Sequence, residues 1–67
     1  MKISIRAARQ NSGLTQEQMA NALGVSRKTY QDYEHGETAM RIDKAQLFSS
    51  LTKVPMDNII FLLKNYG

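Results

Sequence analysis

Long polar side chains gather in residues 26–32, in an order that suits hydrogen bonding to the edges of DNA bases. Arg27 and Lys28 are adjacent, and Gln31 follows one helical turn later on the same side. An arginine can donate two hydrogen bonds to O6 and N7 of guanine, a lysine can reach the same acceptors, and a glutamine suits adenine. We predict that these three side chains contact bases in the major groove.

Ser26 and Asp32 flank this set and are also predicted base contacts. The Ser26 hydroxyl first suits a helix cap, since it can accept from a backbone N–H, and its role at the groove edge comes second. Asp32 can accept from the amino group of cytosine, although phosphates repel its charge.

Two short helices joined by a tight turn must position these side chains. Thr15 can accept from the backbone N–H of Gln18 while the Gln18 side chain reaches back, which is the capping box that begins a helix. Gly24 directly follows the apolar stripe of this helix and is suited to end it in the left-handed conformation. The stripe consists of Met19, Ala20 and Leu23.

The second helix is predicted over residues 26–34, with Tyr30 and Tyr33 on its inner face and the three long polar side chains on its outer face. Two helices joined by three or four residues that include a glycine form a helix-turn-helix, whose second helix can enter the major groove. We call residues 26–34 the recognition helix.

These residues resemble the Cro/CI-type (XRE-like) helix-turn-helix domain of phage and prophage repressors. The resemblance covers about residues 5–61 and rests on G-L-T-Q-E-Q-M-A from Gly13, L-G-V-S from Leu23 and Y-E-x-G from Tyr33. It implies an all-α, five-helix, lambda-repressor-like DNA-binding domain with the helix-turn-helix at helices 2 and 3. It also implies a sequence-specific transcriptional regulator that binds double-stranded DNA, in particular a Cro-like or prophage repressor.

The resemblance assigns roles to two further positions. It implies an ion pair between Arg9 and Glu34, which would tie the first helix to the end of the third; the alternative is a solvated arginine worth under ~1 kcal/mol. It also implies that Gln16 holds the DNA backbone and braces Arg27. The position of Gln16 at the start of a helix independently supports the phosphate contact, because the free N–H groups at a helix N-terminus can bind a phosphate.

Three more residues follow the recognition helix and are predicted to contact phosphates on its far side: Thr38, Arg41 and Lys44. Phosphate contacts fix register, whereas base contacts carry specificity.

The flanking segments are predicted to brace the helix pair. A first helix is expected within residues 3–12 and a fourth over residues 42–52, and Pro55 can begin another. Their inward-facing residues are predicted to be Ile5, Ala8, Ala45, Phe48 and Thr52, with Ile3 as a further candidate.

Five consecutive apolar residues, 59–63, exceed what one face of a helix can bury. Either part of this segment is a short extended tail, or Phe61 to Leu63 cover a second surface, such as a dimer partner or a missing domain. We expect a homodimer on two half-sites about 34 Å apart, with its interface in the apolar residues after Asn58.

Length and composition agree with one small domain over residues 1–67. The chain has 67 residues, a net charge of +3, no cysteine and one histidine, His35, so we expect no metal and no cofactor. The six acidic residues are scattered singly without a nucleophile–base pattern, so we expect no enzyme and no small-molecule substrate. No apolar run approaches the ~18 residues of a membrane span, and we expect a cytoplasmic protein without membrane association.

Two other functions stay open at this point. The apolar tail would suit a protein-binding module, such as an antitoxin or anti-regulator, although the cationic outer face of residues 26–31 speaks against it. A structured-RNA binder would need exposed aromatic side chains for stacking, and both tyrosines of the recognition helix are predicted to be buried.

Overall fold

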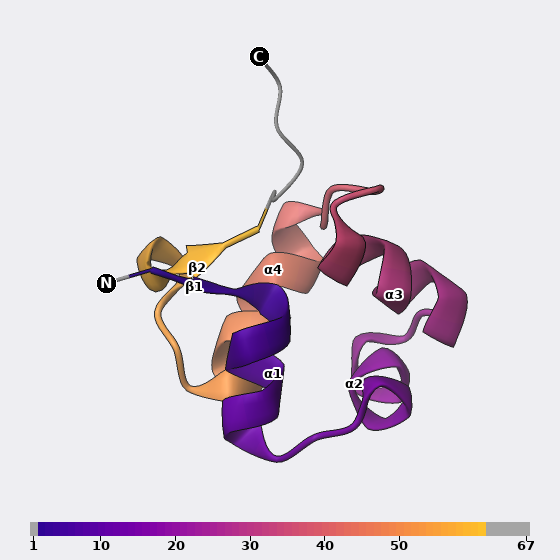
Figure 1. The fold of residues 1–67 in the computed structure, drawn as a ribbon, viewed down its shortest axis with the longest axis horizontal. Helices are drawn as coiled ribbons and strands as arrows, with labels where there is room; N and C mark the ends of the chain where they lie inside the picture. The colour runs from indigo at the N-terminus through magenta and orange to yellow at the C-terminus, as the bar shows by residue number, and fades with distance from the viewer. Residues whose placement is uncertain (1, 62–67) are drawn as a thin grey trace.

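The computed structural model describes residues 2–61, which form a small, mostly helical fold (Figure 1). In chain order the described elements are β1 (Ile3–Ser4), α1 (Ile5–Ser12), α2 (Gln16–Leu23), α3 (Arg27–His35), α4 (Ile42–Thr52), the 3-10 turn η1 (Met56–Asn58) and β2 (Ile59–Ile60). The helix-turn-helix consists of α2 and α3, as predicted, and the recognition helix corresponds to Ser26 as cap followed by α3.

The first three helices owe their limits to local signals. Each begins at a hydroxyl side chain that accepts from the backbone N–H three residues later, and each ends at a glycine with φ between 74° and 80°. The caps are Ser4, Thr15 and Ser26, and the glycines are Gly13, Gly24 and Gly36. The predicted capping box of Thr15 and Gln18 is present.

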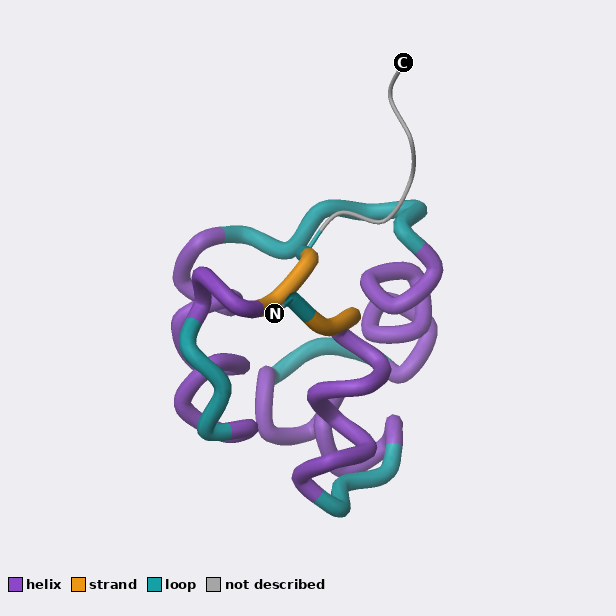
Figure 2. Tube along the Cα trace, turned by 60° about the vertical axis from the view of Figure 1, so that its left-hand side comes forward, coloured by secondary structure: helices purple, strands orange, loops and turns teal. Residues whose placement is uncertain are grey.

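The two chain ends of the described region meet in a parallel pair of very short strands. Ile3 pairs with Ile59 and Ser4 with Ile60, so β1 and β2 lie side by side (Figure 2). The first helix begins at Ile5, within the predicted range, because Ser4 ends the strand and caps α1.

The predicted fifth helix is wrong for the described residues. After Pro55 the chain makes only the single turn η1 and then extends into β2. Ile59 is 5% exposed and Ile60 is 36% exposed, an alternation that a strand provides and that buries one β-branched residue while its neighbour faces outward. The extended alternative thus holds for residues 59–60; Leu62 and Leu63 lie outside the described residues.

One apolar core joins all the elements, with α1 against α4 and α2 against α3. Of the residues predicted to face inward, Ile3 is only partly buried and the others are buried. Met40, in the loop before α4, joins them without having been predicted. The buried apolar residues are Ile5, Ala8, Met19, Ala20, Leu23, Tyr30, Tyr33, Met40, Ala45, Phe48 and Ile59. Because this core fixes α2 and α3 from behind, their outer surfaces have a defined orientation.

Candidate nucleic-acid interface

Gly24, Val25 and Ser26 join α2 to α3 and set the angle between them. Gly24 has a φ of 74°, and the N–H of Val25 donates to the Ala20 carbonyl across 3.0 Å, which closes the end of α2. Ser26 Oγ then accepts from the N–H of Thr29 at 3.1 Å and begins α3. Two helix ends are thus satisfied within three residues, so the turn is rigidly defined.

The inner face of α3 is fixed by its two tyrosines. Tyr30 is fully buried and Tyr33 is buried, and their rings meet edge to face at 6.3 Å between centroids. Arg27 and Lys28 are exposed on the other side of the helix, as the sequence predicts, whereas Gln31 is half-buried.

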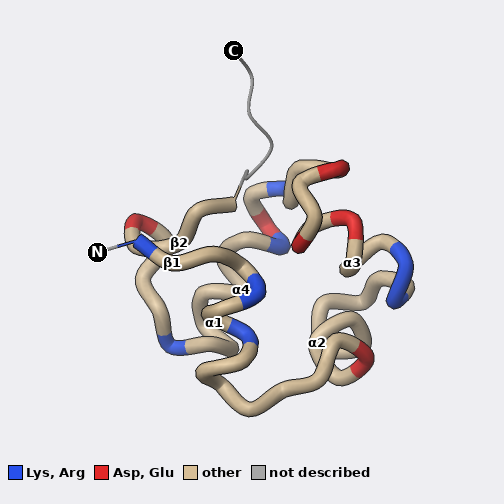
Figure 3. The backbone as a smooth tube through the Cα atoms, viewed as in Figure 1, with Lys and Arg blue, Asp and Glu red and all other residues tan. Residues whose placement is uncertain are grey.

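The outer face begins cationic and becomes mixed along the helix. In Figure 3 the start of α3 is blue and its second half carries red positions. Lys28 Nζ lies 2.9 and 3.2 Å from the two carboxylate oxygens of Asp32, one turn later. The two predicted base contacts therefore form one ion pair, which offsets the repulsion that Asp32 alone would meet near phosphates.

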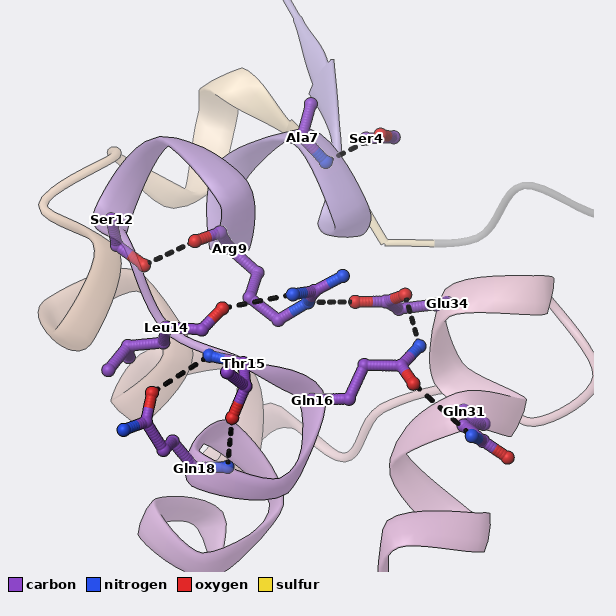
Figure 4. Close-up of polar contacts among 10 residues, drawn as sticks. All are labelled: Ser4, Ala7, Arg9, Ser12, Leu14, Thr15, Gln16, Gln18, Gln31 and Glu34. Atoms are coloured by element: carbon purple, nitrogen blue, oxygen red, sulfur yellow. Dashed lines mark hydrogen bonds and ion pairs between the residues drawn. The ribbon is translucent and has the colours of Figure 1, made fainter.

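A chain of hydrogen bonds runs from α1 to the surface of α3 (Figure 4). Arg9 Nε donates to Glu34 Oε2 at 2.6 Å, Gln16 Nε2 donates to Glu34 Oε1 at 3.0 Å, and Gln31 Nε2 donates to Gln16 Oε1 at 3.2 Å. A second guanidinium nitrogen of Arg9 donates to the Leu14 carbonyl at 2.9 Å. The ion pair implied by the resemblance is present, but Gln16 contacts Gln31 instead of bracing Arg27.

The centre of this network is a buried charge pair. Burial works to raise the pKa of Glu34, but the hydrogen bonds and charge supplied mainly by Arg9 outweigh it and hold that pKa below its ordinary value. The Tyr30 hydroxyl is buried near the same carboxylate, and burial, followed by its interaction with Glu34, raises the pKa of Tyr30. Glu34 is therefore ionised and Tyr30 neutral at physiological pH.

An open hollow of about 840 Å³ lies in front of this network, between α1, the start of α2 and α3. Arginines from two helices, Arg6 and Arg27, line it together with Gln16 and Gln31. The N-terminus of α2 opens onto the same place, and its partial positive charge favours an anion there. The negative charge of Glu34, which also lines the hollow, is balanced by Arg9.

The three residues predicted to touch phosphates beyond α3 differ in their surroundings. Thr38 is exposed, and Arg41 is exposed with its Nε 3.6 Å from Asp43 Oδ1. Lys44 instead donates its ammonium to the Leu23 carbonyl at 2.7 Å, at the C-terminus of α2. Two of the three are free to move toward a nearby polyanion, while Lys44 would have to leave a helix end that it caps.

Other kinds of site lack support in the part of the chain that the structure describes. No three histidine, cysteine, aspartate or glutamate side chains among residues 2–61 come together to hold a metal ion. None of the described helices has the length and apolarity to cross a membrane. His35 ends α3 as an exposed residue at the edge of the hollow.

Sequence reasoning missed two features of this surface. The contact between Gln16 and Gln31 joins two helices, and the contact between Lys44 and Leu23 joins residues 21 positions apart. Neither has a local sequence signal, because each depends on how two helices cross.

A comparison with protein-family models matches the helix-turn-helix model HTH_3 over residues 5–59. No curated protein and no solved structure matched this chain. The matched region spans α1 through the first residue of β2 and includes every residue of the surface described above.

Proposed function

Because this chain belongs to the helix-turn-helix family and that membership makes it a DNA-binding transcription regulator, we propose that it is a sequence-specific repressor of the Cro or prophage type. In this proposal α3 enters the major groove. The domain acts by binding alone, without catalysis, metal or cofactor.

The observation that carries the proposal is the two-sided character of α3. Its tyrosines are locked into the core, while Arg27 and Lys28 extend outward from its first turn. The N-terminal residues of a recognition helix are those that meet base edges in helix-turn-helix proteins. Arg27 would donate to guanine O6 and N7, and the Lys28–Asp32 pair would offer a donor and an acceptor to neighbouring base pairs.

Backbone contacts would then fix the register. Gln16 and the free N–H groups at the start of α2 face the hollow, and Thr38 and Arg41 lie beyond the other end of α3. This arrangement supports phosphate contacts on both sides of the groove that α3 occupies. Ser26, by contrast, is engaged as the cap of α3, so a base contact from it would be additional to that role.

We further propose that two copies bind together on half-sites about 34 Å apart, because one short helix reads few base pairs. The interface that we expected after Asn58 is only partly available: Ile59 is buried in its own core, and Phe61 packs against Phe48 with ring centroids 6.1 Å apart. Ile60 is the exposed apolar residue of this segment, and Leu62 and Leu63 lie outside the described residues. Trimming residues 62–67 should weaken self-association and operator affinity together; an unchanged sedimentation profile would reject this interface.

A protein-binding function is the second candidate, and exposed apolar side chains on α4 favour it. Ile42 is 66% exposed and Leu47 is exposed as well. Such a module would purify with a stoichiometric protein partner and would show no selectivity among DNA duplexes.

Selection from a random duplex pool, followed by binding of the selected sequence at two salt concentrations, tests the proposal. We expect a site with two related halves, and an affinity that falls steeply as salt rises because bound counterions are released. Recovery of no common sequence, or an affinity independent of salt, would contradict it.

A further inference from the structure

The hydrogen bonds that lead outward from Glu34 have a fixed direction. An ionised carboxylate only accepts hydrogen bonds. Glu34 receives Arg9 Nε on one oxygen and Gln16 Nε2 on the other, and it is buried and held ionised by Arg9. The Gln16 amide must therefore turn its NH2 group toward Glu34.

This orientation passes to the next side chain. With its NH2 group on Glu34, Gln16 presents its carbonyl oxygen to α3, where it accepts from Gln31 Nε2 at 3.2 Å. The Gln31 carbonyl oxygen then lies on the side of the amide away from Gln16 (Figure 4). Rotating the Gln31 amide by half a turn would set two carbonyl oxygens against each other, so the relay opposes that state.

We propose that this relay makes Gln31 an oriented reader that offers its carbonyl oxygen to the DNA and thereby selects a base with an amino group in the major groove. The inference rests on the proposed function, since it presumes that α3 lies in that groove. Adenine fits best, because its N6 amino group can donate to the oxygen while the second N–H of the Gln31 amide reaches N7; cytosine offers its N4 amino group alone. Guanine presents only acceptors at these positions and would face the carbonyl oxygen.

Gln16 and Glu34 are positioning residues in this scheme, and Gln31 alone touches the base. A free glutamine can present either its oxygen or its NH2 group, and so it distinguishes adenine from guanine poorly. The relay removes one of the two choices. Its starting point is buried between α1 and α3, whereas its end, Gln31, is half-buried at the rim of the hollow.

The test compares ratios of affinities on the selected operator. The operator position that faces Gln31 is the one at which the protein loses its base preference in Gln31→Ala. Binding is then measured with adenine or with guanine at that position. We expect the wild-type chain to favour adenine by about tenfold, and Gln16→Ala to reduce that ratio severalfold while the preference at the base read by Arg27 is kept. Loss of a phosphate contact by Gln16 would weaken both sites equally and would leave the ratio unchanged.

Two further variants complete the design. Glu17→Ala, an exposed change on the same helix, is the matched control and should keep the ratio. Gln31→Glu keeps the shape but can only accept, so it should still favour an amino-bearing base even though it cannot donate to Gln16. Thermal unfolding of each variant shows whether it is folded before binding is measured.

The relay is overturned by any of three results: a wild-type preference for guanine or thymine at this base, an unchanged ratio in folded Gln16→Ala, or no base whose preference depends on Gln31. Each of these leaves the proposed function intact as long as salt-dependent, selective binding to DNA persists. Absence of selective duplex binding would overturn both.

Discussion

Arg9 and Glu34, 25 residues apart in the chain, form a buried ion pair in which Nε lies 2.6 Å from Oε2. Arg9 is 9% exposed and Glu34 is 5% exposed, so neither charge can be solvated if the other is removed. The pair joins α1 to the end of α3 and holds the carboxylate on which Gln16 depends. It therefore contributes to the stability of the fold and to the shape of the proposed DNA-binding surface.

Removing both members of the pair should cost less than the sum of the two single losses. We expect Arg9→Met and Glu34→Met each to lower the free energy of unfolding by about 3 kcal/mol or more, because each leaves an uncompensated buried charge. The double variant should be clearly more stable than the sum of the two losses predicts. Urea denaturation measures all three, with Arg6→Met, an exposed change on α1, as the control. Additive losses would show that the two side chains do not interact energetically.

Acid should weaken the fold through Glu34. Its pKa in the folded chain lies below the ordinary value of 4.5, so the ionised carboxylate stabilises the folded state at higher pH. This contribution is complete above the unfolded-state pKa and is lost as the pH falls through the lower folded-state pKa. Between about pH 5 and pH 3 the free energy of unfolding of the wild-type chain should fall more than that of Glu34→Gln. Glu17→Gln is the matched exposed change, and equal slopes in wild type and Glu34→Gln would refute the assignment.

Two residues in the left-handed backbone region should respond to substitution in opposite directions. Gly24 has a φ of 74°, and a Cβ added there would meet nothing closer than Lys44 Nζ at 3.7 Å, so the cost of Gly24→Ala is one of backbone conformation. We expect a loss of about 1 kcal/mol. Lys53, with a φ of 63° at the end of α4, already bears that strain, so Lys53→Gly should raise stability by up to about 1 kcal/mol. Thermal unfolding compares the two variants, and a shift of both in the same direction would be inconsistent with this reasoning.

Substitution of Lys44 should lower stability without affecting DNA binding, whereas substitution of Arg41 should affect DNA binding without lowering stability. The Lys44 ammonium caps the end of α2 at the Leu23 carbonyl, so Lys44→Met should cost about 1 kcal/mol of stability and leave the salt dependence of DNA binding unchanged. Arg41 is exposed, so Arg41→Met should alter stability by less than about 0.5 kcal/mol. It should also reduce the slope of log affinity against log salt concentration by about one. A reduced slope for Lys44→Met would instead support the phosphate contact that the sequence predicts for Lys44.

The helix-turn-helix itself could be predicted from the sequence because its signals are local. The capping box at Thr15, the glycine at position 24 and the hydroxyl cap at Ser26 each act within a few residues, and the structure has all three. The apolar stripes were equally informative, since a helix places residues three and four apart on one face.

Features that join distant parts of the chain could not be predicted from the residues alone, and the Arg9–Glu34 pair was expected only because the resemblance implies it. Strand β1 has two residues and shows no alternation, and its partner β2 lies near the other end of the described chain, so Ile3 and Ile59 carry no recognisable pairing signal. Pro55 permits a helix without requiring one, and the burial of Ile59 favoured an extended chain instead. The side-chain bonds of Gln16 and Lys44 depend on how helices cross, which composition and spacing leave undetermined.

The central claim is that the exposed first turn of α3 reads duplex DNA. The most direct measurement compares the affinities of the wild-type chain and Arg27→Ala. Each is measured on the selected operator and on a scrambled duplex, at two salt concentrations. We predict that Arg27→Ala loses about 1–3 kcal/mol on the operator and much less on the scrambled duplex, while the wild-type chain retains a steep salt dependence on both. Equal losses on both duplexes, or no loss on either, would contradict the claim that this turn carries sequence recognition.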